Sequence, residues 1–277
     1  MIVDAHVHLF PDRLAEAIRR WFSEHAWEIR YRLGVDEAVR TLREGGIDRF
    51  VVLPYAHKTG MAAALNDFTL QLARAYPEVV PCCTAFPGEE GIERLLDGAL
   101  GEQGFHGVKI HSHVMRVAPD DPRLDPVWRA SARHRKPVVI HCGREPASAG
   151  YGTDVRALSG AARLRRALAR HPDAICIVPH LGMDEPAAFE ALLDEFPNLY
   201  LDTTMAITGY FPDPPDLDIL RRRADRILYG TDFPNLPYGW DRELQVVRGL
   251  GLPPSDEARI LSGNAIRLFG LQSSDIQ

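Results

Sequence analysis

The chain has 277 residues, of which 45% are hydrophobic and 25% are charged, and its formal net charge is −6. The excess of acidic residues disfavours nucleic-acid binding, and no apolar run reaches the ~20 residues that a membrane helix needs. No charged-then-apolar leader precedes the first strand, so we expect a cytoplasmic protein. The length fits one domain, residues 1–277.

The first predicted strand covers residues 2–10 and places Asp4, His6 and His8 on one face, because strand side chains alternate with a period of two. Residues 11–32 are predicted as an aromatic-rich helix and loop, placed to cover a site at the end of this strand. Further helices are expected at 35–44, 61–76, 92–100, 125–134, 155–170, 185–196 and 217–224. Apolar strands alternate with them at 50–53, 79–85, 106–111, 137–141, 174–178, 199–202 and 226–232.

Short, continuously apolar strands that alternate with helices indicate a parallel sheet covered on both faces. Eight such units predict an α/β fold of the (β/α)8 TIM barrel type, with an extra segment after strand 1. The alternative, an open doubly wound sheet, would need a glycine-rich phosphate-binding turn of the G-x-G-x-x-G kind, which the sequence lacks. Residues 241–271 are predicted to form helices that close the barrel, and residues 273–277 a fraying polar tail.

The four cysteines stand in apolar, strand-like stretches without C-x-x-C spacing; they are Cys82, Cys83, Cys142 and Cys176. Their context predicts reduced thiols packed in the core rather than disulfides or a zinc knuckle.

Ionisable side chains stand where the predicted strands end, which is where a barrel of this type builds its active site. Burying such groups is costly unless they are paired or bind a metal. Several imidazole nitrogens with a carboxylate match a catalytic metal site that keeps a position for water. The alternative is a set of polar strand ends with satisfied hydrogen bonds, and for His180 a capping or core role. The residues concerned are His6, His8, Lys109, His111, His141, His180 and Asp232.

Four motifs in this order resemble the signatures of the amidohydrolase superfamily: Asp4-Ala5-His6-Val7-His8, Val139-Ile140-His141, Pro179-His180-Leu181-Gly182 and Leu228-Tyr229-Gly230-Thr231-Asp232-Phe233-Pro234. The chain is most similar to the amidohydrolase-related branch that includes aminocarboxymuconate-semialdehyde decarboxylase and related metal-dependent hydrolases. The resemblance implies a distorted TIM barrel with one divalent metal, usually zinc. It also implies His6, His8, His141 and Asp232 as ligands, and His180 as a catalytic residue beside the metal.

These roles are chemically consistent with one another. Bound zinc lowers the pKa of its water to about 7. Asp232 is placed to take a proton from that water and pass it to a leaving group, and His180 to stabilise charge on a carbonyl oxygen.

Lys109 leaves three alternatives open. In binuclear members of the superfamily a carbamylated lysine on the fourth strand bridges two metals, and the resemblance places Lys109 at that position. An unmodified Lys109 would instead contact a substrate carboxylate, or extend its amine to solvent from the barrel rim. Because the branch that the chain resembles is usually mononuclear, we expect one metal.

Substrate contacts are expected from Lys109, His111, Arg144 and Tyr55, with His57, Arg116 and Met205 on further loops that face the site. The guanidinium of Arg144 is suited to bidentate binding of a carboxylate; the alternative for Arg144 is a surface ion pair of little energetic value.

The first functional hypothesis is a metal-dependent hydrolase that uses zinc-activated water to attack an amide, ester or lactone carbonyl. The alternative is a non-oxidative decarboxylase of a small unsaturated or aromatic acid, and a third, of another class, is a non-catalytic metal-binding barrel. The expected partner is a small molecule, with carboxylates among the candidates, and neither nucleic acid nor membrane. A homo-oligomer is left open, because the aromatic stretch at 21–31 suits an interface as well as a lid.

Overall fold

The computed structural model of the chain describes residues 1–212 and 214–271. All eight predicted strands form within these residues, and the third is split in two at Cys82. The strands are β1 (Val3–Val7), β2 (Arg49–Val52), β3 (Val79–Pro81), β4 (Cys83–Thr84), β5 (Val108–His111), β6 (Val138–His141), β7 (Cys176–Val178), β8 (Leu199–Asp202) and β9 (Ile227–Leu228).

The helices follow the predicted rhythm. They are α1 (Asp12–His25), α2 (Val35–Glu44), α3 (Ala62–Ala75), α4 (Ile92–Gly101), α5 (Ser112–Met115), α6 (Asp125–His134), α7 (Val155–Leu158), α8 (Ala161–Arg170), α9 (Pro186–Glu195), α10 (Ile219–Arg222), α11 (Arg242–Gly249), α12 (Pro254–Ala258) and α13 (Asn264–Phe269). Short helical turns are η1 (Pro122–Leu124), η2 (Ala149–Tyr151), η3 (Pro179–Gly182) and the π-helical η4 (Arg259–Gly263).

The single helix predicted at 155–170 is wrong, because the chain breaks between α7 and α8. Gly160 there has a φ of 111°, which a helix excludes, and its N–H donates to the Cys142 carbonyl at 2.7 Å. The helix predicted within 11–32 ends at His25, and the one predicted at 217–224 is a single turn, Ile219–Arg222. The tail predicted at 273–277 lies outside the described residues.

The strands pair in parallel as two sheets, β1-β2-β3 and β4 through β9 in sequence order. They meet at the split third strand, where the Cys82 N–H donates to Val52 and the Cys83 N–H to Gly107. At the other side, the Ala5 N–H donates to the Tyr229 carbonyl at 2.9 Å and the His8 N–H to Phe233 at 2.8 Å. We call this junction of β1 with residues 229–233 the seam. The result is a distorted TIM barrel made of two sheets instead of one continuously paired cylinder.

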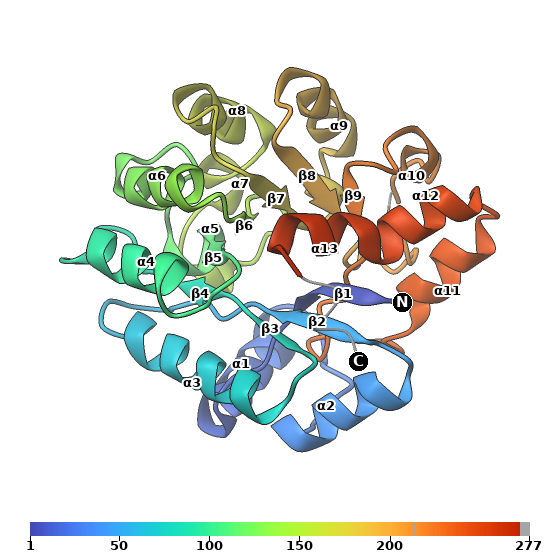
Figure 1. The fold of residues 1–277 in the computed structure, drawn as a ribbon, viewed down its shortest axis with the longest axis horizontal. Coiled ribbons are helices and arrows are strands. Elements are labelled where there is room, and N and C mark those ends of the chain that lie inside the picture. Colours follow the sequence, from blue (N-terminus) through green and yellow to red (C-terminus); the bar gives the residue numbers. More distant parts are fainter. Residues whose placement is uncertain (213, 272–277) are drawn as a thin grey trace.

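Helices surround the strands, and α13 lies across the centre of the ring (Figure 1). Alternate strand residues such as Val3, Val51 and Val139 form an apolar cluster with Phe269 of α13. Since α13 covers the interior on this side, the polar strand ends are left for the opposite side of the barrel. The outward-facing strand residues pack under the helices in a second, larger cluster around side chains such as Trp128, which is fully buried.

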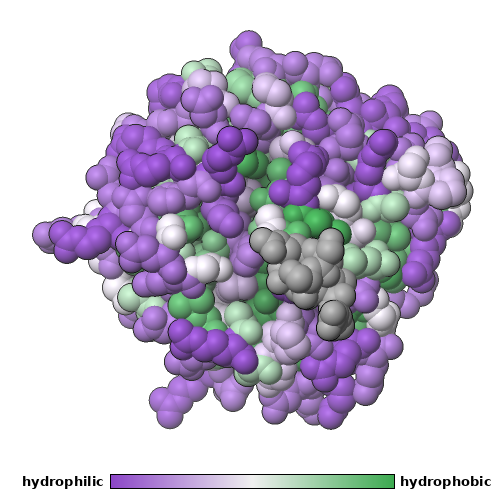
Figure 2. Space-filling view, viewed as in Figure 1, coloured by the Kyte–Doolittle hydropathy of each residue, from purple (hydrophilic) through white to green (hydrophobic). Residues whose placement is uncertain are grey.

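All four cysteines are buried free thiols, as predicted. Within the described part of the chain, no helix combines the length and apolar character needed to cross a bilayer. The face seen in Figure 2 is mainly hydrophilic, with hydrophobic residues gathered near its centre.

Candidate functional site

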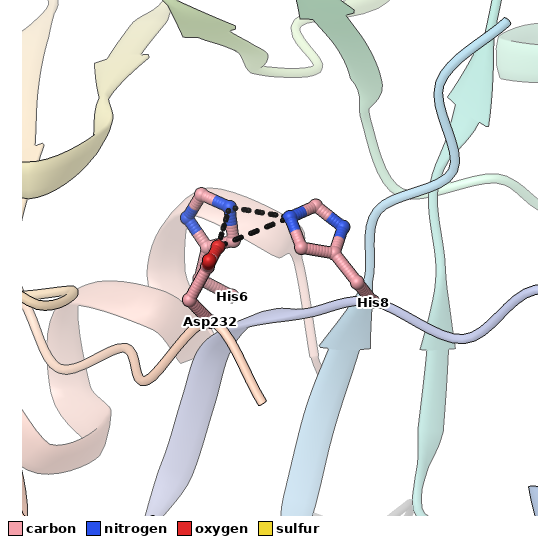
Figure 3. A group of neighbouring side chains, drawn as sticks. All are labelled: His6, His8 and Asp232. Atoms are coloured by element: carbon pink, nitrogen blue, oxygen red, sulfur yellow. Dashed lines mark hydrogen bonds and ion pairs between the residues drawn. The ribbon is translucent and has the colours of Figure 1, made fainter. Parts of the chain in front are cut away.

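His6, His8 and Asp232 converge where the first strand meets the segment after the last one (Figure 3). The two Nε2 atoms lie 3.2 Å apart, and the Asp232 Oδ1 lies 3.4 Å from that of His6 and 3.1 Å from that of His8. All three side chains are at least nine-tenths buried. We call these residues the His/Asp cluster.

Hydrogen bonds behind the cluster orient its two imidazoles. The Nδ1 of His8 lies 2.8 Å from the Leu53 carbonyl, and the Nδ1 of His6 lies 2.8 Å from the Asp202 carboxyl group. A carbonyl only accepts, so His8 carries its proton on Nδ1, and an ionised Asp202 requires the same of His6. The lone pairs of both Nε2 atoms then face the Asp232 oxygen, which is unfavourable without a cation among them.

The cluster fits a metal ion. Ligand atoms at about 2.0–2.2 Å from one tetrahedral or octahedral ion lie roughly 3.0–3.5 Å from each other, as these three atoms do. Two imidazoles with a carboxylate suit zinc and other divalent transition metals. The carboxyl group of Asp202 and the carbonyl of Leu53 would be the outer hydrogen-bond partners that usually orient ligating histidines.

The protonation states of the cluster also suit a cation. Burial raises the pKa of Asp232, but in the absence of a metal a proton on the His8 Nε2 would supply the hydrogen bond and charge that, together with His6, outweigh burial and lower this pKa to about 2. Burial, followed by the charge of Lys109, holds the pKa of His6 well below its ordinary range. At neutral pH the cluster therefore offers an ionised carboxylate and an unprotonated imidazole.

Local backbone structure presents Asp232 to the histidines. Asp232 has a φ of 75°, which is costly for a residue other than glycine, and its N–H donates to the His6 carbonyl at 2.9 Å. The neighbouring Thr231 hydroxyl donates to the Asp4 carboxylate at 2.6 Å. Thus Asp4, predicted only as a member of the histidine face, fixes the seam from which Asp232 projects.

His141 lies in the same region with its ring turned towards His180. The His141 Nδ1 is 3.1 Å from the His180 Nε2, and its own Nε2 is 3.1 Å from the Glu145 carbonyl. His180 donates from Nδ1 to the Thr204 carbonyl at 2.9 Å, so its Nε2 is an acceptor. A neutral His141 has one proton for these two contacts, and burial keeps its pKa well below the ordinary value. The assignment of His141 as the fourth ligand stays a prediction.

Lys109 is directly beside the cluster. Its Nζ lies 3.2 Å from the His6 Nε2, and the residue is only 1% exposed. The rim alternative, in which the amine reaches solvent, is therefore wrong. Burial lowers the pKa of Lys109 to about 8, so its ammonium donates to the nitrogen that a metal would use.

Two adjoining cavities open beside the cluster. The smaller, about 30 Å³, is lined by His6, His8, Lys109, His141, His180 and Asp232 among others. The larger, about 280 Å³, lies under α1 and is lined by Leu14, Ile18, Trp21, His57, Val114 and Arg116 among others. Phe22, Tyr55, His111 and Tyr151 line both. The segment after β1 covers this site, as its position in the sequence predicted.

The expected substrate contacts separate into two groups. Tyr55 packs edge-on against His8, with ring centroids 5.2 Å apart, and His111 stacks on His141 at 4.3 Å. Arg144 lines neither cavity, because its guanidinium is paired with Asp184 at 2.8 Å and Glu185 at 3.2 Å. For Arg144 the structure thus favours the ion-pair alternative.

Sequence reasoning missed Asp202, which connects both parts of the site. One carboxylate oxygen pairs with the His6 Nδ1, and the other accepts the backbone N–H groups of His180 at 3.0 Å and Thr204 at 3.1 Å. The available signal was the one that identified His141: a polar residue that ends an apolar strand, here Leu199–Asp202.

Solved structures of low sequence identity share this fold. An uncharacterised TIM-barrel protein of Bordetella bronchiseptica is 20% identical, with a TM-score of 0.74 over 97% of this chain and 98% of that one. A 5-carboxyvanillate decarboxylase of Novosphingobium aromaticivorans, complexed with manganese and 4-hydroxy-3-methoxy-5-nitrobenzoic acid, is 17% identical, with a TM-score of 0.72 over 98% and 96%. A 4-oxalomesaconate hydratase of Rhodopseudomonas palustris is 18% identical, with a TM-score of 0.66 over 98% and 96%.

No curated protein matches the chain. A family model described as amidohydrolase matches residues 3–271, which is nearly the whole sequence. This match agrees with the motifs at the strand ends and with the barrel that holds them. The chain belongs to the amidohydrolase family.

Proposed function

We propose that residues 1–277 form one catalytic domain, a metal-dependent carboxy-lyase that removes CO2 from a small aromatic or unsaturated acid without an oxidant. The larger cavity carries this proposal. Its volume of about 280 Å³ is near the lower end of the range for small-molecule sites, and rings and aliphatic side chains form most of its wall. Such a wall suits a planar, apolar ring whose carboxyl group reaches the His/Asp cluster.

The apolar wall around the ring supports decarboxylation in particular. The carbon–carbon bond breaks, its electron pair stays on the ring carbon, and an apolar wall beside the ring would favour this dispersed charge over the concentrated charge of the carboxylate. Hydrolysis, in contrast, consumes a water molecule. The solved decarboxylase complexed with manganese and a nitrobenzoic acid supports the same class of ligand for this chain.

A divalent ion held by His6, His8 and Asp232, with His141 as the predicted fourth ligand, would stabilise negative charge as a Lewis acid. Manganese joins zinc as a candidate. His141 and His180 are hydrogen-bonded to each other on the cavity wall, and the proton that replaces the lost carboxyl group would come from solvent through His180. Asp202 accepts hydrogen bonds from the His6 imidazole and the His180 backbone, and so positions both a metal ligand and a residue of the proton path.

Hydrolysis of an ester, amide or lactone is the second candidate, and one observation favours it. The Asp232 carboxylate, with a pKa of about 2, is ionised and lines the smaller cavity, where it would accept a proton from an attacking water.

The deciding experiment uses protein loaded with Mn²⁺ or Zn²⁺ and a panel of hydroxylated benzoic acids, esters and lactones in ¹⁸O-labelled heavy water. CO2 release with one deuterium and no ¹⁸O in the product supports the lyase. A product that keeps all its carbon and gains ¹⁸O identifies a hydrolase, and a metal-loaded protein inert on the whole panel supports a non-catalytic barrel. Asp232→Asn should lower turnover strongly, whereas the exposed control Asp225→Asn should not.

A further inference from the structure

We propose that Arg116 binds a second anionic group of the substrate, so that the larger cavity selects planar acids with two acidic groups, such as aromatic dicarboxylates. This inference rests on the proposed function, because it assumes that the first carboxyl group lies at the His/Asp cluster. It adds the chemical nature of the substrate group that lies farthest from the His/Asp cluster.

Arg116 provides the positive charge of this cavity. Among the described residues that line the larger cavity, Arg116 is the one arginine or lysine, and none is aspartate or glutamate. No carboxylate in residues 1–212 or 214–271 forms an ion pair with Arg116, in contrast to Arg144, which has two acidic partners. A guanidinium that faces a cavity without a countercharge attracts an anion, and its planar fork matches a carboxylate.

The backbone around Arg116 is arranged to hold this side chain at the cavity. Arg116 ends α5 with a left-handed φ of 51°, which is strained for arginine. A Cβ on Gly152 would lie 2.8 Å from the Arg116 Nη2, so the guanidinium passes over a residue that has no side chain. Gly152 itself has a φ of 64° and directly follows η2, whose Tyr151 lines both cavities.

Two neutral imidazoles complete the polar part of the wall. The Nδ1 atoms of His57 and His111 are buried and have no hydrogen-bond partner among the described residues. Both residues line the cavity beside Arg116, and His111 also lines the smaller cavity. Each imidazole can donate one hydrogen bond to an anionic oxygen without adding charge, so discrimination between charged and uncharged substituents depends on Arg116.

The test measures binding instead of turnover. Calorimetry on the metal-loaded protein compares 1,3- and 1,4-benzenedicarboxylate with 3- and 4-methylbenzoate, in which a methyl group replaces the second carboxylate. Because Arg116 lines the cavity but is exposed to solvent, we expect the better dicarboxylate to bind about ten-fold tighter than its methyl partner, the lower end for charge-assisted hydrogen bonds. Trp21 lines the cavity, so its fluorescence reports the same event.

Arg116→Met should reduce this preference to less than about three-fold, and Arg116→Lys should keep part of it. The matched control is Arg135→Met: Arg135 is also exposed, ends α6 with a φ of 54° and does not line the cavity. Equal preference in the wild-type protein and Arg116→Met, or no preference in either, would overturn the proposal. Because no catalytic step is measured, this failure is distinguishable from failure of the carboxy-lyase assignment, which the labelled-product assay detects.

Discussion

Glu243 gives a prediction in which protonation of one buried carboxyl group controls stability. The side chain is fully buried at the start of α11, and its Oε1 accepts hydrogen bonds from the Tyr238 hydroxyl at 2.6 Å and the Met205 N–H at 3.2 Å. The Oε2 is buried without a partner among the described residues. Burial raises the pKa of Glu243 to about 8 although these hydrogen bonds lower it.

The sign follows from where the proton is bound. Between the pKa of an unfolded glutamate, 4.5, and the folded value of about 8, the native state holds a proton that the unfolded state has lost. The free energy of unfolding therefore decreases as pH rises through this window, and the contribution of Glu243 is constant below it and above it. At about 1.4 kcal/mol per pKa unit, the loss between pH 5 and pH 8 is roughly 3–4 kcal/mol.

Glu243→Gln keeps an oxygen for Tyr238 and Met205 but cannot ionise. From pH 5 to pH 8 the wild type should lose roughly 3–4 kcal/mol of unfolding free energy through Glu243, and the variant should not lose this amount. Urea unfolding at several pH values measures it, with the exposed Glu16→Gln as the control that keeps the wild-type dependence. Parallel curves for wild type and Glu243→Gln would refute the reasoning.

Three further predictions concern the His/Asp cluster. The double variant His6→Ala/His8→Ala should lose bound metal in elemental analysis while its circular dichroism remains native, because the apolar clusters of the barrel do not include these ligands; stoichiometric metal in the variant would defeat the assignment. Asp232→Asn, saturated with metal, should lower kcat by about 10²–10⁴ with little change in KM, and a change in KM alone would exclude a proton-transfer role. Lys109→Met should raise metal affinity at pH 7 by up to about ten-fold, because the Lys109 pKa of about 8 lets its proton compete for the His6 nitrogen. Chelator competition at pH 6, 7 and 8 measures this, and an unchanged pH dependence would contradict it.

Most of the fold was predictable because its signals are local. Runs such as Val138–His141 are buried on both faces and therefore read as continuous apolar stretches that end in a polar residue. The same rule located His6, His8 and Asp232, since parallel strands of a barrel bring their carboxyl ends together.

Side-chain direction was harder to predict because it depends on partners that are distant in the chain. Arg144 was expected at the substrate, but Asp184 and Glu185 from the loop after β7 hold it. His141 turns to His180, and only the folded chain shows that Asp202 contacts His6. The larger cavity is likewise lined by residues of α1, β5 and η2, so no single sequence motif predicts it.

The seam gives the His/Asp cluster a role in the order of assembly. Two of its members come from the first strand and the third from the segment after the last one, so a chain emerging from the ribosome has no such cluster until nearly all of it has been made. The metal would thus bind only after the barrel has closed. The bound ion would then link the first strand to the segment after the last strand and add to the free energy of global unfolding. Hydrogen exchange at the amides of Ala5, His8 and Asp232, which all donate across the seam, should slow together when metal is added.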